Sequence, residues 1–173
     1  MKSDLPAQDT TARSLAFADW AAICELKARY CRLLDAKSWE EWRGLFTDDF
    51  LSDTSASGGP LIHGADNFIA FVRKTLGAAN RTTVHQVHTP EIEMTSGTTA
   101  RGIWALADFV RFAPGLDLRG FGHYHETYLK LDGQWKIQSS RLTRLREDLV
   151  TPLFSIYLPD RIRRALAKAN GVK

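Results

Sequence analysis

A carboxylate ends the first apolar stretch of the chain. The segment "ARYCRLLD", residues 28–35, has helical spacing and finishes at Asp35. At the C-terminal end of a helix the macrodipole disfavours an anion by a few tenths to about 1 kcal/mol. We therefore expect Asp35 to have a compensating partner elsewhere in the fold. The alternative is an ordinary helix-end or turn residue, which is a common role for aspartate.

A histidine on a later β-branched segment is a suitable partner. In "TVHQVHTP", residues 83–90, strand alternation puts His85 on one face and His88 on the other, so only one of the two faces inward. If the first helix packs across the mouth of a sheet, Asp35 can accept a hydrogen bond from one ring nitrogen of His85. The second nitrogen is then free to take a proton from a substrate, while the carboxylate fixes the tautomer. The alternative is a histidine with a structural hydrogen bond only.

Tyr30 is a candidate for polarising an oxygen atom. Its hydroxyl can point at a substrate carbonyl or at a leaving hydroxyl. Five residues amount to about 140° around a helix, so Tyr30 and Asp35 converge only if the helix frays or turns near Leu34. The alternative is a core tyrosine whose hydroxyl reaches the edge of the apolar region.

Asp108 follows a tryptophan on one face of a later strand. Trp104 and Asp108 share this face, and an inward aspartate among apolar neighbours is costly unless it is paired. Arg144 or Arg146, on the last long strand, could pair with it across the sheet. Such a pair is either part of a polar site or a structural ion pair, because both perturb the local electrostatics.

The remaining histidines and the cysteines give weaker signals. His123 and His125 form an H-x-H pair that could hold a metal together with His85, but supporting carboxylates and a characteristic ligand spacing are not evident. Cys24 and Cys31 lie seven residues apart on one helix, roughly 10 Å along its axis, which is too far for a disulfide. We expect buried thiols and no metal.

Composition indicates an ordinary globular protein. The chain has 173 residues, 44% hydrophobic and 25% charged, with a diffuse net charge of +3 that does not suggest a nucleic-acid partner. The first 15 residues lack the apolar core of a signal peptide, and no apolar run is long enough to cross a membrane, so we expect a cytoplasmic protein. Residues 64–68, "GADNF", do not match a phosphate-binding loop, so we expect no nucleotide or other cofactor.

Three helices are predicted in the first half of the chain. Apolar residues at helical spacing indicate helices over residues 17–35, 38–46 and 64–80, the last of them stopping at Gly77. Ser38 is the expected N-cap of the second helix, with a glutamate three residues later as in a capping box.

The second half is predicted to form strands. Runs rich in β-branched and aromatic residues indicate four long strands over residues 81–95, 98–113, 118–131 and 134–148. The Asp132-Gly133 pair predicts a two-residue hairpin turn. A short basic helix is predicted over residues 158–170.

Helices followed by an antiparallel sheet define an α+β domain. A strongly twisted sheet closed by helices makes a cone whose interior is a natural ligand pocket. We expect a flexible N-terminal segment over residues 1–14, one domain over residues 15–148, and a C-terminal extension with a short helix over residues 149–173.

The order of these segments resembles the SnoaL-like branch of the nuclear transport factor 2-like superfamily. The resemblance rests on three stretches, "YCRLLDAKSWEEWRGLFTDDF", "TVHQVHTPEIEMTSGTTARGIWALADFV" and "GFGHYHETYLKLDGQWKIQSSRLTRLR". It implies a curved antiparallel sheet with a helical lid, assembled as a trimer or dimer. The fold itself hosts dehydratases, isomerases, cyclases and binding modules, so it does not fix one reaction.

Within this branch the pattern is most similar to the dehydratase group that includes scytalone dehydratase and bile acid 7α-dehydratase. In that group an aspartate at the end of the first helix and a strand histidine form a dyad for cofactor-free elimination. By this resemblance Tyr30, Asp35 and His85 match the catalytic tyrosine, aspartate and histidine. Asp108 and Arg146 match a further polar pair.

The sequence therefore predicts a cofactor-independent lyase acting on a hydrophobic, hydroxylated cyclic small molecule. His85 removes a proton, Asp35 supports it, and Trp104 and His88 contribute to the substrate-binding pocket. The same dyad could shuttle a proton within the substrate, as in an isomerase or a polyketide-type cyclase. A non-catalytic small-molecule-binding module is the alternative from a different class.

Overall fold

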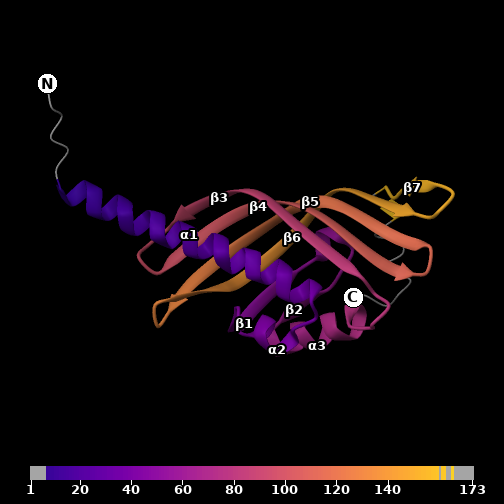
Figure 1. Cartoon of the computed structure of the whole chain (residues 1–173), viewed down its shortest axis with the longest axis horizontal. Helices are drawn as coiled ribbons and strands as arrows, with labels where there is room; N and C mark the ends of the chain where they lie inside the picture. Colours follow the sequence, from indigo (N-terminus) through magenta and orange to yellow (C-terminus); the bar gives the residue numbers. More distant parts are fainter. Residues whose placement is uncertain (1–6, 160, 163–164, 166–173) are drawn as a thin grey trace, which may run out of the picture.

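The computed structural model describes residues 7–159, 161, 162 and 165 (Figure 1). Its helices are α1 (Ala7–Asp35), α2 (Trp39–Arg43), the short 3₁₀ helix η1 (Ser55–Ser57) and α3 (Ala65–Leu76). Its strands are β1 (Phe46–Asp53), β2 (Leu61–His63), β3 (Thr83–Met94), β4 (Thr99–Ala113), β5 (Leu116–Leu131), β6 (Gln134–Val150) and β7 (Ser155–Tyr157). The α+β class expected from the sequence is confirmed.

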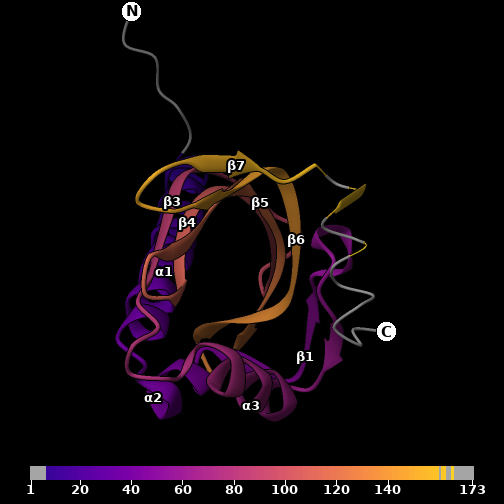
Figure 2. The same cartoon turned by 90° about the vertical axis from the view of Figure 1, so that its right-hand side faces the viewer.

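All strands belong to one curved, unclosed sheet. The strand order is β2-β1-β6-β5-β4-β3, and β7 pairs with the C-terminal end of β6. Every pairing is antiparallel except β1 with β6, which is parallel. Seen end-on, the sheet curves from β3 round to β1, with α1 beside β3 and with α2 and α3 below (Figure 2). The helices therefore face the concave side of the sheet.

Helix α1 presents one apolar stripe to this concave side. Ile23, Leu26, Tyr30, Leu33 and Leu34 are all buried, as the helical spacing of the apolar residues predicts. The helix begins at Ala7, earlier than the sequence indicated, and it ends at Asp35 as expected. The carboxylate is therefore placed at the C-terminal end of the helix.

An aromatic cluster packs where α2 and α3 cover the concave side of the sheet (Figure 2). The rings of Trp42, Phe46, Phe50 and Phe68 have centroids 4.5–5.5 Å apart, and they come from α2, β1 and α3. Trp42 and Phe50 are fully buried. Burial of an apolar side chain of this size contributes about 1.5–3 kcal/mol. The cluster therefore fixes α2 and α3 against the sheet.

Four features differ from the expectations. Ser38 is the N-cap residue of α2, as expected, but its side chain makes no capping hydrogen bond, and its backbone N–H donates to the Leu33 carbonyl. Residue 46, expected at a helix end, belongs to β1, and residues 61–63, for which no strand was predicted, form β2. Both strands depend on pairing with segments elsewhere in the chain. The strand β7 was also not expected. Most of the basic helix predicted at 158–170 lies outside the described residues.

The four long strands and the hairpin turn follow the sequence prediction. Asp132 and Gly133 have φ values of 48° and 78°, as an Asp-Gly hairpin turn requires. Side chains alternate between the two faces along β4 and β5, and the even-numbered residues over 100–110 and 120–128 are buried and face inward. No described helix combines the length and the apolar character that a bilayer crossing needs.

Candidate functional site

The carboxylate at the end of α1 contacts the inward-facing histidine of β3. Asp35 Oδ1 lies 2.7 Å from Nδ1 of the His85 ring, and the His85 side chain is 7% exposed. Because an ionised carboxylate only accepts hydrogen bonds, Nδ1 carries the proton, and Nε2 is the nitrogen with a free lone pair. Nε2 makes no hydrogen bond to another described residue. The structure thus brings together the two side chains that the sequence paired.

Two further donors hold the Asp35 carboxylate. The Thr83 hydroxyl donates to Asp35 Oδ1 at 2.8 Å, and the backbone N–H of His85 donates to Oδ2 at 2.8 Å. Hydrogen bonds to a charged group contribute about 1.5–3 kcal/mol each, more than the helix dipole costs. These contacts are the compensation that a carboxylate at a helix C-terminus requires.

His85 lines a cavity of about 230 Å³ between α1, α3 and the concave face of the sheet. Its apolar wall comes from α3 and the aromatic cluster, and includes Phe68, Phe71 and Val72. Tyr30 and Asp108 also line it, so the cavity gathers three of the residues that the sequence nominated. The polar groups Asp108 and Arg144 come from strands, which also contribute the apolar side chains of Val110 and Leu142 to the lining.

The polar part of the lining is built around an arginine from β6. Arg144 Nη2 lies 2.7 Å from Asp108 Oδ2, and Arg144 Nε lies 3.0 Å from Glu147 Oε1. The Arg144 and Asp108 side chains are 8% and 3% exposed. Burial alone lowers the pKa of Arg144, but the Asp108 and Glu147 carboxylates outweigh it and hold the pKa above its ordinary value. This group therefore stays a cation inside the cavity wall.

The partner of Asp108 is Arg144, one of the two arginines that strand spacing left open, and not Arg146, which the family resemblance favoured. Strict alternation would put both arginines on one face, but the β5–β6 register shifts at Leu145, where Gly122 pairs with Arg144 and Phe121 with Arg146. The extra residue in this β-bulge turns the following side chains round. Arg146 consequently faces outward, 59% exposed, and pairs with Asp148 at 2.8 Å.

Two tyrosines form the wall next to α1. The rings of Tyr30 and Tyr124 meet edge-on with centroids 6.0 Å apart, and both residues line the cavity. Burial raises the pKa of both, and the neighbouring Glu126 raises that of Tyr30 further. Both phenols therefore stay protonated, so each has a hydroxyl proton that it can donate to an oxygen in the cavity. Tyr124 was not nominated from the sequence, although alternation along β5 marks it as inward-facing.

A buried ion pair lies directly behind the tyrosines. The fully buried Lys27 Nζ is 2.5 Å from Glu126 Oε1, and it lies 4.1 Å and 3.8 Å from the ring centroids of Tyr30 and Tyr124. Cation–π contacts of this kind contribute about 2 kcal/mol when they are desolvated. The sequence did not indicate that Lys27 forms a buried ion pair, because its counter-ion Glu126 lies on a strand far along the chain.

Trp104 belongs to this buried network and not to the cavity lining. Its indole N–H donates to the Tyr128 hydroxyl at 2.7 Å, and Tyr128 donates to Glu126 at 2.6 Å. Ser140 also donates to Glu126, at 3.0 Å. The expected substrate-binding role of Trp104 therefore has no contact with the cavity to support it.

The other histidines lie away from the cavity. His88, which was expected in the substrate-binding pocket, is exposed on the face of β3 opposite to His85 and is not among the residues that line the cavity. His123 and His125 are outward-facing on β5 with ring centroids 6.3 Å apart, and burial lowers the pKa of His125. Among the described residues, no three metal-ligating side chains come together, and Cys24 and Cys31 are free thiols.

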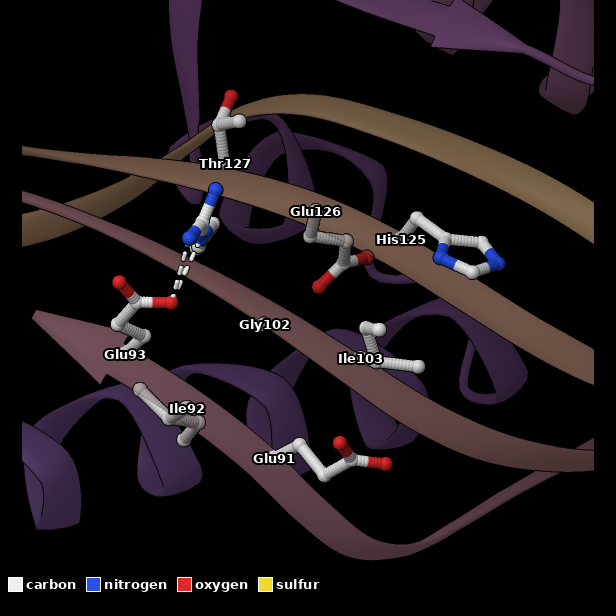
Figure 3. A pocket seen from close by; sticks show the side chains of 9 residues that line it. Glu91, Ile92, Glu93, Gly102, Ile103, His125, Glu126 and Thr127 are labelled. Carbon is white, nitrogen blue, oxygen red and sulfur yellow. Dashed lines mark hydrogen bonds and ion pairs between the residues drawn. The ribbon is translucent and has the colours of Figure 1, made fainter. Parts of the chain in front are cut away.

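An open groove of about 520 Å³ lies on the outer face of the sheet. Glu91, Ile103 and His125 line it from three neighbouring strands, and an ion pair between Arg101 and Glu93 borders it (Figure 3). None of the cavity residues named above takes part in it, so this groove is separate from the candidate site.

A curved, unclosed sheet covered by helices is the fold of the nuclear transport factor 2-like superfamily. Residues 16–141 match the family model of the SnoaL-like domain. The chain therefore belongs to the SnoaL-like family, as the sequence resemblance indicated.

Individual relatives agree with this assignment. The chain is 26% identical over 137 residues to "Probable cyclase FGR4" of Gibberella zeae, which covers 72% of this chain and 90% of the relative. A candidate scytalone dehydratase from Novosphingobium aromaticivorans superposes with a TM-score of 0.70 at 24% identity, covering 78% of this chain and 89% of that protein. The dehydrochlorinase LinA superposes with a TM-score of 0.72 at 18% identity, covering 85% and 97%. The two solved structures establish the likeness of fold.

Proposed function

We propose that this chain is a cofactor-independent lyase that removes water from a hydrophobic, hydroxylated cyclic small molecule. One observation carries the proposal. The Asp35 carboxylate accepts a hydrogen bond from His85 Nδ1 at 2.7 Å, while the same ring lines a largely apolar cavity. This arrangement leaves Nε2 as a general base at the cavity surface, in an environment where few other groups compete for a substrate proton.

The cavity groups suit an elimination. His85 Nε2 takes a proton from a carbon next to a carbonyl, and Asp35 stabilises the imidazolium that forms. The C–H electron pair becomes the new double bond as the neighbouring C–O bond breaks. The leaving hydroxyl takes the proton back from the imidazolium and departs as water, which returns His85 to its neutral state. The Tyr30–Tyr124 pair donates a hydrogen bond to the oxygen on which charge develops.

The relatives support the same class of chemistry. One is named as a cyclase, one as a candidate scytalone dehydratase, and one is a hexachlorocyclohexane dehydrochlorinase. Dehydration and dehydrochlorination are both eliminations that begin with proton removal. We extend this shared step, and not any relative's substrate, to the present chain.

The size of the cavity limits the substrate. Its volume of about 230 Å³ is below the range of about 300–1,000 Å³ typical of sites for drug-sized ligands. We therefore favour a compact ring system, such as a polyketide-derived enone, over a steroid-sized one. Arg144, Asp108 and the tyrosine pair supply polar contacts, and the phenylalanines of α3 cover the ring.

The first test is His85→Ala, assayed on a panel of hydroxylated cyclic enones with product analysis by mass spectrometry. Loss of a general base typically lowers the rate by about 10²- to 10⁴-fold. We expect loss of this size on any compound that the wild-type protein dehydrates. The matched control is His88→Ala, since this exposed residue on the other face of β3 should leave turnover unchanged. Near-wild-type activity of His85→Ala would reject the proposed base.

The curated relative named as a cyclase favours a second candidate function with the same residues. In an isomerase or cyclase, His85 would return the proton to another atom of the substrate, and no water would be lost. Product mass separates the two, because an isomer keeps the mass of the substrate. Tight binding of a panel member with no product from the wild-type protein would instead indicate a binding module.

A further inference from the structure

The turn that follows α1 contains a lysine in an unusual backbone conformation. Lys37 has a φ of 60°, in the left-handed region. The Lys37 N–H donates to the Leu34 carbonyl at 3.1 Å and the Ser38 N–H donates to the Leu33 carbonyl at 2.9 Å. This is the position after a helix end where glycine, or sometimes asparagine, is usual, because other side chains are strained there. A lysine at this position calls for a reason outside the turn itself.

The Lys37 side chain reaches towards Asp35 through one intermediate residue. Its Nζ donates to Thr83 Oγ1 at 2.9 Å, and the Thr83 hydroxyl donates to Asp35 Oδ1 at 2.8 Å. Thr83 is 4% exposed, so water has little access to its hydroxyl. A threonine hydroxyl has one proton, and the lysine contact leaves that proton for the carboxylate.

The chain of contacts fixes the carboxylate where it touches the histidine. Asp35 Oδ1 accepts both the Thr83 hydroxyl and His85 Nδ1–H, so the position of Thr83 sets the direction in which this oxygen faces the ring. The Lys37 ammonium polarises the hydroxyl between them, and hydrogen bonds linked in this way strengthen one another. The other contact of the ammonium, with the Trp39 ring at 5.9 Å, is at the limit of a cation–π interaction.

We propose that Lys37 and Thr83 are positioning residues that orient the Asp35 carboxylate and thereby hold the His85 ring in the tautomer with its proton on Nδ1. The inference rests on the proposed function, because this tautomer is the one that exposes a basic Nε2 to the cavity. Neither Lys37 nor Thr83 lines the cavity. Both act through Asp35, and glycine at position 37 would satisfy the turn but could not reach Thr83.

The test is ¹⁵N NMR of the His85 ring in the full chain, at a pH at which the ring is neutral. The ring-nitrogen signals report the ratio of the two tautomers directly, and His85→Gln assigns them among the five histidines. Thr83→Val removes the hydroxyl at nearly constant shape, with Thr83→Ser as the matched control that keeps it. Lys37→Met removes the ammonium, with Lys37→Arg as the control that keeps a cation. Asp35→Asn serves as the reference for loss of the carboxylate.

We expect Thr83→Val and Lys37→Met each to lower the ratio of the Nδ1–H to the Nε2–H tautomer by about two- to tenfold, the range that one hydrogen bond supports. Thr83→Ser and Lys37→Arg should remain close to wild type. If Thr83→Val does not fold, the comparison of Lys37→Met with Lys37→Arg tests the inference, since the Lys37 side chain is only partly buried.

The inference is overturned if Asp35→Asn shifts the ratio while Thr83→Val and Lys37→Met both leave it unchanged. A shift with Thr83→Val alone would overturn the role of Lys37. If Asp35→Asn itself has no effect on the ratio, the dyad is wrong, and it is the proposed function that fails. The three variants thus separate the positioning role from the dyad on which it depends.

Discussion

Asp108 shows how a single buried charge depends on which of two arginines reaches it. The sequence left Arg144 and Arg146 open by spacing, and the family resemblance favoured Arg146. In the structure Arg144 makes the contact, at 2.7 Å, and Gly120 lies beneath the pair, where a Cβ would collide with both side chains. The absence of a side chain at Gly120 thus makes room for the ion pair on the cavity wall.

Replacing the two arginines in turn tests this assignment. Arg144→Met leaves the Asp108 carboxylate buried without this cation, and we expect a loss of about 3–5 kcal/mol in the free energy of unfolding. Arg146→Met removes an exposed partner and should cost less than about 1 kcal/mol. Urea denaturation measures both values.

A second replacement checks the cause of that loss. Asp108→Asn added to Arg144→Met should restore part of the stability, because it removes the unpaired charge. An equal effect of the two single arginine variants would show that the pairing is misassigned.

At the scale of elements, the end of α1 matters more than its length. The helix, its turn and the start of β3 together hold Asp35, Lys37, Thr83 and His85. The contacts between α1 and β3 place these residues side by side although they are about 50 positions apart in the sequence. The turn is strained at Lys37, and backbone strain of this kind is concentrated at functional sites.

The strain at Lys37 predicts a difference between two small replacements. Lys37→Gly and Lys37→Ala both lose the hydrogen bond to Thr83, but only alanine keeps a Cβ at a φ of 60°. We expect Lys37→Gly to be more stable than Lys37→Ala by about 1 kcal/mol. Thermal and urea denaturation of the two variants measure this difference. Equal stabilities would mean that the turn is not strained.

At the scale of the whole molecule, the core contains several buried phenol and thiol groups, among them Tyr30, Cys31 and Tyr128. Burial raises the pKa of Tyr30 and Tyr128 well above 10 and that of Cys31 to about 11. Several of these groups surround the Lys27–Glu126 ion pair. The outer face of the sheet, by contrast, exposes apolar side chains such as Leu145 and Phe121. Assembly as a trimer or dimer stays a prediction of the family resemblance.

The buried phenols and thiol predict a loss of stability at alkaline pH. Their pKa values in the folded state lie above the unfolded values of 9.0 for cysteine and 10.0 for tyrosine. Above these values the unfolded chain releases protons that the folded chain keeps, so the stability is fully present below about pH 9 and falls as the pH rises.

Each such group contributes up to about 1.4 kcal/mol per pH unit in that range. Urea denaturation between about pH 8 and pH 11 measures the slope. Tyr30→Phe should reduce the slope, because phenylalanine has no proton to lose. A stability that stays constant over this interval would contradict the burial of these hydroxyls.

Local patterns in the sequence determined a large part of this protein. The apolar stripe predicted α1 and its end at Asp35, alternation put His85 and His88 on opposite faces of their strand, and Asp132-Gly133 marked the hairpin. Each of these depends on residues within a few positions of one another. The dipole argument for Asp35 was also local, which is why the need for a partner was visible before the partner was located.

Only the tertiary structure decided the rest. The bulge at Leu145 determined that Arg144 and not Arg146 contacts Asp108. Pairing with β6 made residues 46–53 a strand, which their sequence had not indicated. The fold also placed Lys27 beside Glu126 and Lys37 beside Thr83. A register shift of one residue reverses every following side chain, and a buried charge is stable only beside its partner. Strand register and the pairing of buried charges both depend on contacts between segments far apart in the chain. The spacing of residues along the sequence therefore does not predict them.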